Sequence, residues 1–293
     1  MKIDSRIIAL FTEGGAKHYK IHIEMMKLFS MFGYLSSEEL KYHFKGYKYV
    51  FLMNRLYNLY KYRIVDKFLS LSIPKYFYYI TGLGRDVVEY FQISDFISNF
   101  YPAHYSLANS YHHRKMINVY SVFKRVLVDL MKGWTVEEML KREETGAGAK
   151  VFDAEVFVSA VVKICKKLED GSEYDSGQRK YRDVRMMIEL ETSLKTPRRY
   201  EKLANVLTDF HMHRKRLGRE AAKYIFICKG ETIKDRIRRH LVNRIISREA
   251  EIVFIDLDEL IEKEGEAIVE DIRGERSKFK EIYIIKEYVE GML

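Results

Sequence analysis

Hydrophobic residues in the first 45 positions recur every three or four residues, which is the spacing of one face of an α-helix. Between residues 19 and 33 the apolar positions are Ile21, Met25, Leu28, Phe29 and Phe32, and Gly33 follows as a helix-ending residue. A second, shorter helix is predicted after the serines at 36 and 37. Two glutamates follow these serines, in the first turn, where the positive end of the helix dipole favours them.

A third helix is predicted after Gly46, because the same spacing continues from residue 49 to residue 60. Its opposite face carries Lys45, Lys48, Arg55 and Asn58. From residue 63 to 80 the apolar positions alternate instead, on both sides of Pro74, which predicts a β-hairpin. A turn and a short helix, residues 81–89, complete this part of the chain.

Three helices followed by a hairpin within about 90 residues resemble a winged helix-turn-helix, a fold that places its third helix in the DNA major groove. We therefore assign residues 1–92 to a DNA-binding domain of this kind. Lys45, Lys48 and Arg55 would then face DNA, while Lys67 and Lys75 of the hairpin would contact phosphates. Winged helices also serve as protein-interaction modules, and this alternative stays open.

The pattern of the remaining residues, added to this first domain, predicts an α+β or α/β multidomain protein. Residues 93–147 are predicted to form a helical bridge, including a helix at 135–144, and the Gly-Ala-Gly-Ala sequence at 146–149 is interpreted as a flexible break. Residues 148–293 are predicted to form a mixed sheet flanked by helices, with strands at 151–160, 184–192, 223–228 and 251–256, helices at 197–215 and 232–246, and a polar loop at 175–180.

Composition and charge then narrow the class of partner. The chain has 293 residues, of which 47% are hydrophobic and 32% charged, so it is globular and not disordered. The net charge is +9, and it is unevenly distributed. Residues 1–92 hold 14 basic and 8 acidic residues and residues 148–250 hold 24 and 15, whereas the last 43 hold 6 and 13. Two basic regions suit a long anionic partner such as DNA.

The two cysteines and the hydropathy pattern bear on the cellular compartment. Cys165 and Cys228 both lie in apolar runs and cannot make a disulfide framework, which favours a reducing compartment. No stretch reaches the roughly 18 apolar residues of a membrane span, and the first 14 residues lack a signal-peptide pattern. The sequence predicts a cytoplasmic protein with no membrane partner.

The residues that suggest chemistry are Asp153 and, 36 residues later, Glu189 and Glu191. Side chains alternate along a strand, so the two glutamates would share one face. Carboxylates in an apolar strand are costly unless a metal ion, an arginine or solvent receives them. Mg²⁺ is one such receiver, with Asp153, Glu189 and Glu191 as its ligands.

These residues resemble the PD-(D/E)xK nuclease superfamily, in which an Asp on one strand and Glu-x-Lys on the next bind a metal and activate water. Here Phe152 replaces the proline and Glu191 the lysine, and Lys195 stands four residues further on. The resemblance implies a restriction-endonuclease-like domain and a Mg²⁺-dependent DNA endonuclease. In it, Asp153 and Glu189 would be catalytic metal ligands and Glu191 a further ligand or a base acting through water. Lys195 would stabilise the negative charge that develops on the phosphate.

A narrower resemblance covers nearly the whole chain. The order of winged helix, residues 104–109 (His-Tyr-Ser-Leu-Ala-Asn), Asp153-Ala154, Glu189-Leu190-Glu191 and Arg199-Tyr200 resembles the replication-relaxation and mobilisation proteins of plasmids and integrative elements. It implies a DNA-binding accessory in replication, relaxation or conjugative mobilisation, with a relaxase or another mobilisation protein as partner.

A non-catalytic alternative is equally compatible with the residues. Arg198, Arg199 and Lys202 would either contact DNA phosphates along the helix after the acidic strand or lie on its solvated surface. In the non-catalytic case the carboxylates pair with Arg198 or Arg199. The protein is then a transcriptional regulator or a relaxase-recruiting protein, and its last domain mediates homodimerisation or recruitment.

Overall fold

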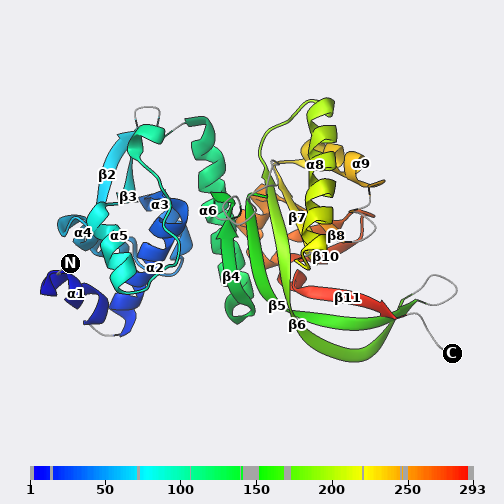
Figure 1. Cartoon of the computed structure of the whole chain (residues 1–293), viewed down its shortest axis with the longest axis horizontal. Helices are drawn as coiled ribbons and strands as arrows, with labels where there is room; N and C mark the ends of the chain where they lie inside the picture. The colour runs from blue at the N-terminus through cyan, green and yellow to red at the C-terminus, as the bar shows by residue number, and fades with distance from the viewer. Residues whose placement is uncertain are drawn as a thin grey trace. The chain divides into compact units, whose positions relative to one another are not determined.

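A computed structural model of the chain describes residues 3–13, 16–70, 73–105, 107–138, 140, 152–167, 173–219, 221–244, 246 and 250–289. It is a mixed α/β protein, as the sequence predicted. The chain divides into two compact units, Met1–Ser121 and Val122–Leu293, called unit 1 and unit 2 below (Figure 1). Within the described residues, no helix is both long and apolar enough to cross a membrane.

Unit 1 combines helices with a small antiparallel sheet. In chain order its elements are α1 (Ser5–Thr12), α2 (Ala16–Phe32), β1 (Tyr34–Ser36), α3 (Ser37–His43), α4 (Tyr49–Lys61), β2 (Val65–Ser70), β3 (Lys75–Ile80), α5 (Gly82–Tyr90), a 3₁₀ turn (Pro102–His104) and the start of α6 (Leu107–Leu127). The sheet has the strand order β1-β3-β2. The three predicted helices, the hairpin and the short helix after it are all confirmed.

Local sequence accounts for the helix limits in unit 1. Helix α2 ends at Gly33, whose positive φ of 79° suits a residue without a side chain. Helix α3 begins after Ser36, whose hydroxyl accepts a hydrogen bond from Glu38 N while the Glu39 carboxylate accepts one from Ser36 N. This capping box satisfies backbone donors at both positions and defines the start of α3.

Unit 2 is built on one curled mixed sheet with the strand order β10-β9-β8-β7-β6-β5-β11, and β4 also pairs with β5. Its elements are a 3₁₀ turn (Val128–Leu130), β4 (Met131–Val136), β5 (Ala154–Lys167), β6 (Glu173–Glu191), α8 (Pro197–Arg216), β7 (Lys223–Cys228), α9 (Glu231–Leu241), β8 (Glu251–Asp256), α11 (Leu257–Lys263), a 3₁₀ turn (Glu264–Glu266), β9 (Ile268–Asp271), β10 (Arg276–Lys278), a 3₁₀ turn (Phe279–Glu281) and β11 (Ile284–Val289).

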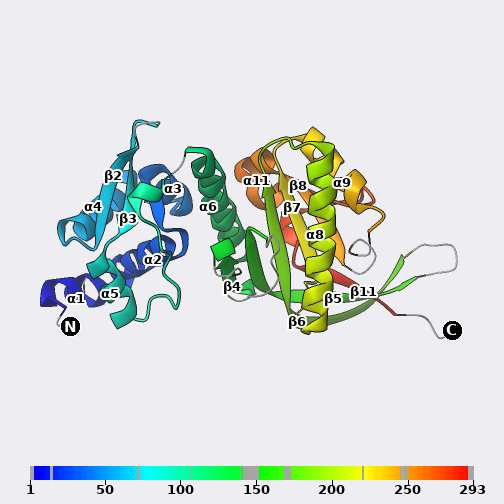
Figure 2. The same ribbon diagram turned by 45° about the horizontal axis from the view of Figure 1, so that its top comes forward.

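In the centre of this sheet, the pairing between neighbouring strands changes from antiparallel to parallel at β6. Strands β4, β5 and β6 are antiparallel neighbours, whereas β7 and β8 run parallel to β6 through the crossover helices α8 and α9. Helices α8 and α9 lie on the same face of the sheet (Figures 1 and 2). Their buried side chains form one core with the strands, which includes Met187, Tyr224, Phe226 and Phe254 from the sheet and Leu203, Leu207, Phe210, Ile233 and Ile237 from the helices.

One predicted element of the second half is wrong and another begins later than predicted. Residues 135 and 136, predicted to begin a helix, end strand β4, because Thr135 and Val136 pair with β5. Residues 175–180, predicted as a polar loop, belong to β6 and pair with β5. Their polarity reflects exposure and not a lack of strand structure. Of the helix predicted at 135–144, residues 137, 138 and 140 are helical, and residues 139 and 141–144 lie outside the described residues, as does the predicted break at 146–149. The strands at 223–228 and 251–256 have the predicted ends, and the other predicted strands and helices are present with shifted ends.

Candidate nucleic-acid interface and carboxylate cluster

The outward side of α4 carries large side chains that are exposed. Val50 is 69% exposed and Tyr57 60%, and Asn54 and Lys61 are also exposed. Steps of three and four residues bring these four side chains onto one side, opposite the buried Leu52, Leu56 and Leu59. We call Val50, Asn54, Tyr57 and Lys61 the α4 outer face. Its residues were missed from the sequence, although the helical period of the buried leucines indicates them.

The predicted basic residues near α4 have different surroundings. Lys45, in the turn before α4, and Lys48, its N-cap residue, are both exposed. Arg55 is half-buried and its guanidinium lies over the Phe51 ring, 4.9 Å from the centroid. Two of the three predicted cations therefore flank the α4 outer face, and the third packs beside it.

The two lysines of the hairpin also differ. The Lys67 Nζ lies 4.9 Å from the ring centroid of Tyr60 and 4.6 Å from that of Tyr76, so two aromatic rings hold the ammonium group by cation–π attraction. The Lys75 Nζ donates to Glu38 Oε1 at 2.5 Å, and this contact lowers the Glu38 pKa. Lys75 is therefore bound within the protein, whereas Lys67 presents a positive charge at the hairpin.

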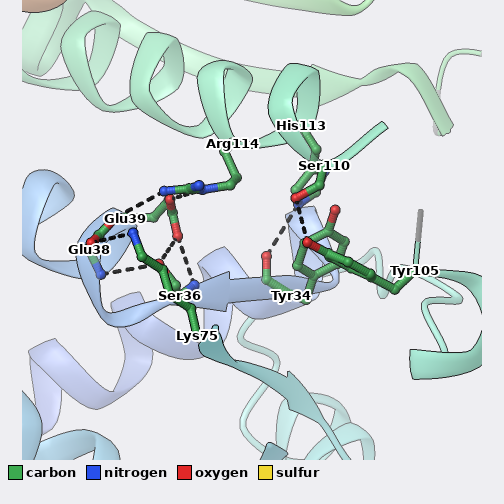
Figure 3. Close-up of polar contacts among 9 residues, drawn as sticks. All are labelled: Tyr34, Ser36, Glu38, Glu39, Lys75, Tyr105, Ser110, His113 and Arg114. Atoms are coloured by element: carbon green, nitrogen blue, oxygen red, sulfur yellow. Dashed lines mark hydrogen bonds and ion pairs between the residues drawn. The ribbon is translucent and has the colours of Figure 1, made fainter. Parts of the chain in front are cut away.

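A polar network joins α3, the hairpin and α6 within unit 1 (Figure 3). The Arg114 guanidinium of α6 donates from Nε to Glu39 Oε1 at 2.5 Å and from Nη2 to Glu38 Oε2 at 3.0 Å. The Glu39 side chain is only 3% exposed, so Arg114 compensates a buried charge. Because Glu38 also binds Lys75, the network ties the hairpin to both helices.

Beside this network, His113 of α6 stacks on Tyr34 of β1, with ring centroids 4.2 Å apart (Figure 3). Its Nε2 lies 3.2 Å from the carbonyl oxygen of Tyr34. Burial lowers the His113 pKa to about 4, because a charged imidazole loses its hydration there. Burial also raises the Tyr34 pKa to about 12. Both rings are therefore neutral at pH 7.

In unit 2, the predicted acidic residues lie on one face of the sheet. Ala154 pairs with Ile188, so Asp153 is positioned opposite Glu189, and strand alternation puts Glu191 on the same face. The Asp153 Oδ2 accepts a hydrogen bond from Leu190 N at 2.7 Å. Glu189 is 1% exposed and Glu191 2%, because this is the face that α8 and α9 cover.

Glu191 and Lys195 are joined directly. The Lys195 Nζ donates to Glu191 Oε1, and the Lys195 backbone N donates to the Tyr200 hydroxyl at 3.0 Å. The predicted phosphate contacts Arg198, Arg199 and Lys202 are exposed on the first turns of α8. Lysine, not arginine, is thus the partner of Glu191.

These residues do not fit a metal site as they are arranged. Among the residues that the structure describes, no group of three or more His, Cys, Asp or Glu side chains converges as metal ligands would. The Asp153 carboxylate binds a backbone amide and the Glu191 carboxylate binds an ammonium group, so both already have hydrogen-bond donors. The arrangement stabilises the junction of β5, β6 and α8.

A second buried ion pair was missed from the sequence. Glu155, 4% exposed, receives Arg214 Nη2 at 2.7 Å, and Arg214 is 2% exposed; Arg185 binds the other oxygen of Glu155. The available signal was a glutamate inside an apolar strand, which requires a cation. Sequence distance hid the partner, because Arg214 lies almost 60 residues further along.

Comparisons with known proteins find no match for this chain among protein-family models, curated proteins or solved structures.

Proposed function

We propose that unit 1 is a winged helix-turn-helix that binds duplex DNA through the α4 outer face. The observation that carries this proposal is the order α2-β1-α3-α4-β2-β3 with the sheet order β1-β3-β2, together with the exposed α4 outer face. In winged-helix proteins the helix at this position enters the major groove.

The chemistry of the α4 outer face supports this occupant. An asparagine amide can pair with both N6 and N7 of adenine, and an exposed valine can contact the thymine methyl group. Asn54 and Val50 lie one helical turn apart, so they would reach neighbouring base pairs. Lys45 and Lys48 at one end, and Lys61 at the other, are positioned for the flanking phosphates.

The charge balance of the units supports the same assignment. Residues 1–121 hold 16 basic and nine acidic residues, a net charge of +7, and the remaining 172 residues supply only +2 of the total of +9. Most of the attraction for a polyanion therefore comes from the smaller unit.

The test is duplex binding by the full chain, measured by fluorescence anisotropy on a random-sequence 20-base-pair duplex in about 0.1 M salt. Replacing both Lys45 and Lys48 by alanine should weaken binding about tenfold, because two phosphate contacts are lost. The matched control replaces Lys20 and Lys27, two exposed lysines of α2, and should bind as the parent does. If both double variants lost the same amount of duplex affinity, the loss would be a non-specific effect of charge. That result would contradict the proposal.

A second candidate function is DNA cleavage by unit 2, which the strand topology favours. Antiparallel β4, β5 and β6 followed by a helical crossover to parallel β7 is the arrangement expected of a PD-(D/E)xK nuclease, with Asp153 opposite Glu189. Against cleavage, Glu189 and Glu191 are buried and the described acidic side chains do not converge as metal ligands. Both observations favour the non-catalytic alternative, a DNA-binding accessory of replication or mobilisation that recruits a relaxase.

Incubation with supercoiled plasmid in Mg²⁺ or Mn²⁺ separates these alternatives. A nuclease nicks the plasmid, and Asp153→Asn and Glu189→Gln abolish nicking while duplex binding persists. An accessory protein leaves the plasmid intact at every metal concentration. Nicking that survives both substitutions would exclude these residues as the catalytic site.

A further inference from the structure

We propose that the free part of strand β6 in unit 2 binds single-stranded nucleic acid, with Tyr181 as a stacking platform. Strand β6 runs from residue 173 to 191, but β7 pairs only with Met186–Glu191. Among the described residues, no strand pairs with residues 178–183 on the side opposite β5. We call residues 178–183 the β6 edge. It extends about 20 Å at 3.3 Å per residue.

The β6 edge is basic and exposed. All six of its residues are exposed: Gln178, Arg179, Lys180, Tyr181, Arg182 and Asp183. Three cations and one carboxylate make it net positive. Arg179 is held by Asp175 through two hydrogen bonds, of 2.7 and 2.6 Å, and this contact lowers the Asp175 pKa to about 2. The turn before the edge is thereby anchored, and Lys180 and Arg182 flank Tyr181.

Charge alone has an ordinary explanation at such an edge, because lysine and arginine prevent two sheets from joining. Tyr181 does not fit this explanation. It is 76% exposed, the highest fraction of any large hydrophobic side chain described, and it has no charge with which to repel a second sheet edge. A ligand that contacts both the cations and the exposed ring would account for the two features together.

Single-stranded nucleic acid is such a ligand, since it offers phosphates and unpaired base faces at once. Proteins bind it with cations along the backbone and aromatic side chains under the bases. Strand alternation places Tyr181 on one face of the ribbon and Lys180 and Arg182 on the other. A strand lying along the β6 edge therefore stacks a base on Tyr181 and passes its phosphates to the two cations. Duplex DNA has its base faces covered and uses only the charges.

The test measures binding of the full chain to a fluorescent 16-nucleotide oligo-dT and, separately, to a duplex. Tyr181→Ala should weaken oligo-dT binding roughly 5- to 100-fold and leave duplex binding within twofold, because stacking on one base is lost. Tyr181→Phe should retain oligo-dT binding, since phenylalanine keeps the ring. Replacing Lys180 and Arg182 by alanine should weaken oligo-dT binding and make the remaining binding less dependent on salt, because fewer phosphates are contacted.

The control replaces Arg273 and Arg276, two exposed arginines of the same unit, and should leave oligo-dT binding unchanged. Unaltered oligo-dT affinity in Tyr181→Ala, or a loss matched by this control, would overturn the proposal. So would a change in molar mass by light scattering on Tyr181→Ala, which would make the β6 edge a contact between two copies of the chain. Duplex binding through α4 is read separately, so either proposal can fail alone.

Discussion

Charged side chains that pair with buried partners stabilise unit 1, and Arg114 is the clearest case. It is 23% exposed, yet it binds two glutamates from α3, of which Glu39 is buried. Glu39 keeps its hydrogen bonds from Ser36 when Arg114 is removed, but it loses the guanidinium that compensates its charge. The loss of stability on removing Arg114 therefore comes mainly from the buried Glu39 carboxylate left without a cation. The lost attraction between the two side chains contributes less.

Arg114→Ala should lower the free energy of unfolding by about 3 kcal/mol, as expected when a buried pair loses one member. Urea denaturation of the full chain, followed by circular dichroism, measures the shift of the unit 1 transition. Arg6→Ala is the matched control, because the Arg6–Asp4 pair is exposed and screened by solvent, so its loss should change stability little. A shift no larger than that of Arg6→Ala would show that the Figure 3 network is not stabilising.

His113 should make unit 1 sensitive to acid. Burial lowers its pKa to about 4, whereas the pKa of a histidine in the unfolded chain is about 6.5. As the pH falls from 6.5 to 4, His113 binds a proton in the unfolded chain but stays neutral in the folded one. The free energy of unfolding therefore falls, by about 3 kcal/mol in total. Glu39 opposes this shift by favouring the charged form and His112 reinforces it.

Unfolding measured at pH 7 and pH 4.5 tests this, with His113→Phe as the comparison. Phenylalanine preserves the stack on Tyr34 but cannot titrate. The variant should lose less stability than the parent between the two pH values, although its stability at pH 7 is lower because the contact with the Tyr34 carbonyl is lost. Identical pH dependence in both proteins would assign the acid sensitivity to other groups.

At the scale of elements, one glycine determines how closely α5 approaches the hairpin. A Cβ at Gly84 would lie 2.2 Å from the Ile64 carbonyl oxygen and 2.7 Å from Ile80 Cγ1. Neither atom can yield without moving backbone or core. A Cβ at Gly82, two residues earlier in the same helix, meets no atom within 4 Å.

Gly84→Ala should therefore destabilise unit 1 by about 2 kcal/mol, the usual cost of forcing an extra methyl into a packed site. Gly82→Ala should be neutral or slightly stabilising, because alanine restricts the unfolded chain more than glycine does. Thermal unfolding of the two variants beside the parent measures the contrast. Equal stabilities would mean that α5 shifts freely on the hairpin.

At the scale of the whole molecule, the two units divide the charge and the proposed binding. Because unit 1 holds a net charge of +7, duplex binding should weaken steeply with salt, and the slope of log affinity against log salt should be reduced by about 2 when Lys45 and Lys48 are replaced. Anisotropy titrations between about 50 and 200 mM salt measure the slope. An unchanged slope would show that neither lysine contacts a phosphate.

Elements with local signals could be predicted from the sequence, and those without could not. The capping box at Ser36 and the leucine spacing of α4 depend on residues within one or two turns, so the sequence located both helices. Strand β4 has no such signal. Its residues become a strand because β5, some 20 residues further on, offers a partner edge. The polar part of β6 was hidden for the same reason.

The sequence by itself determined the local elements, the basic character of unit 1 and the presence of carboxylates in an apolar strand. Only the tertiary structure decided that Glu191 binds Lys195, that Arg55 packs on Phe51 while Asn54 faces outward, and that Tyr181 lies beside an open edge. The physical reason is range. Helix caps and periodicity act between near neighbours, whereas burial and ion pairing depend on which distant surfaces meet when the chain folds.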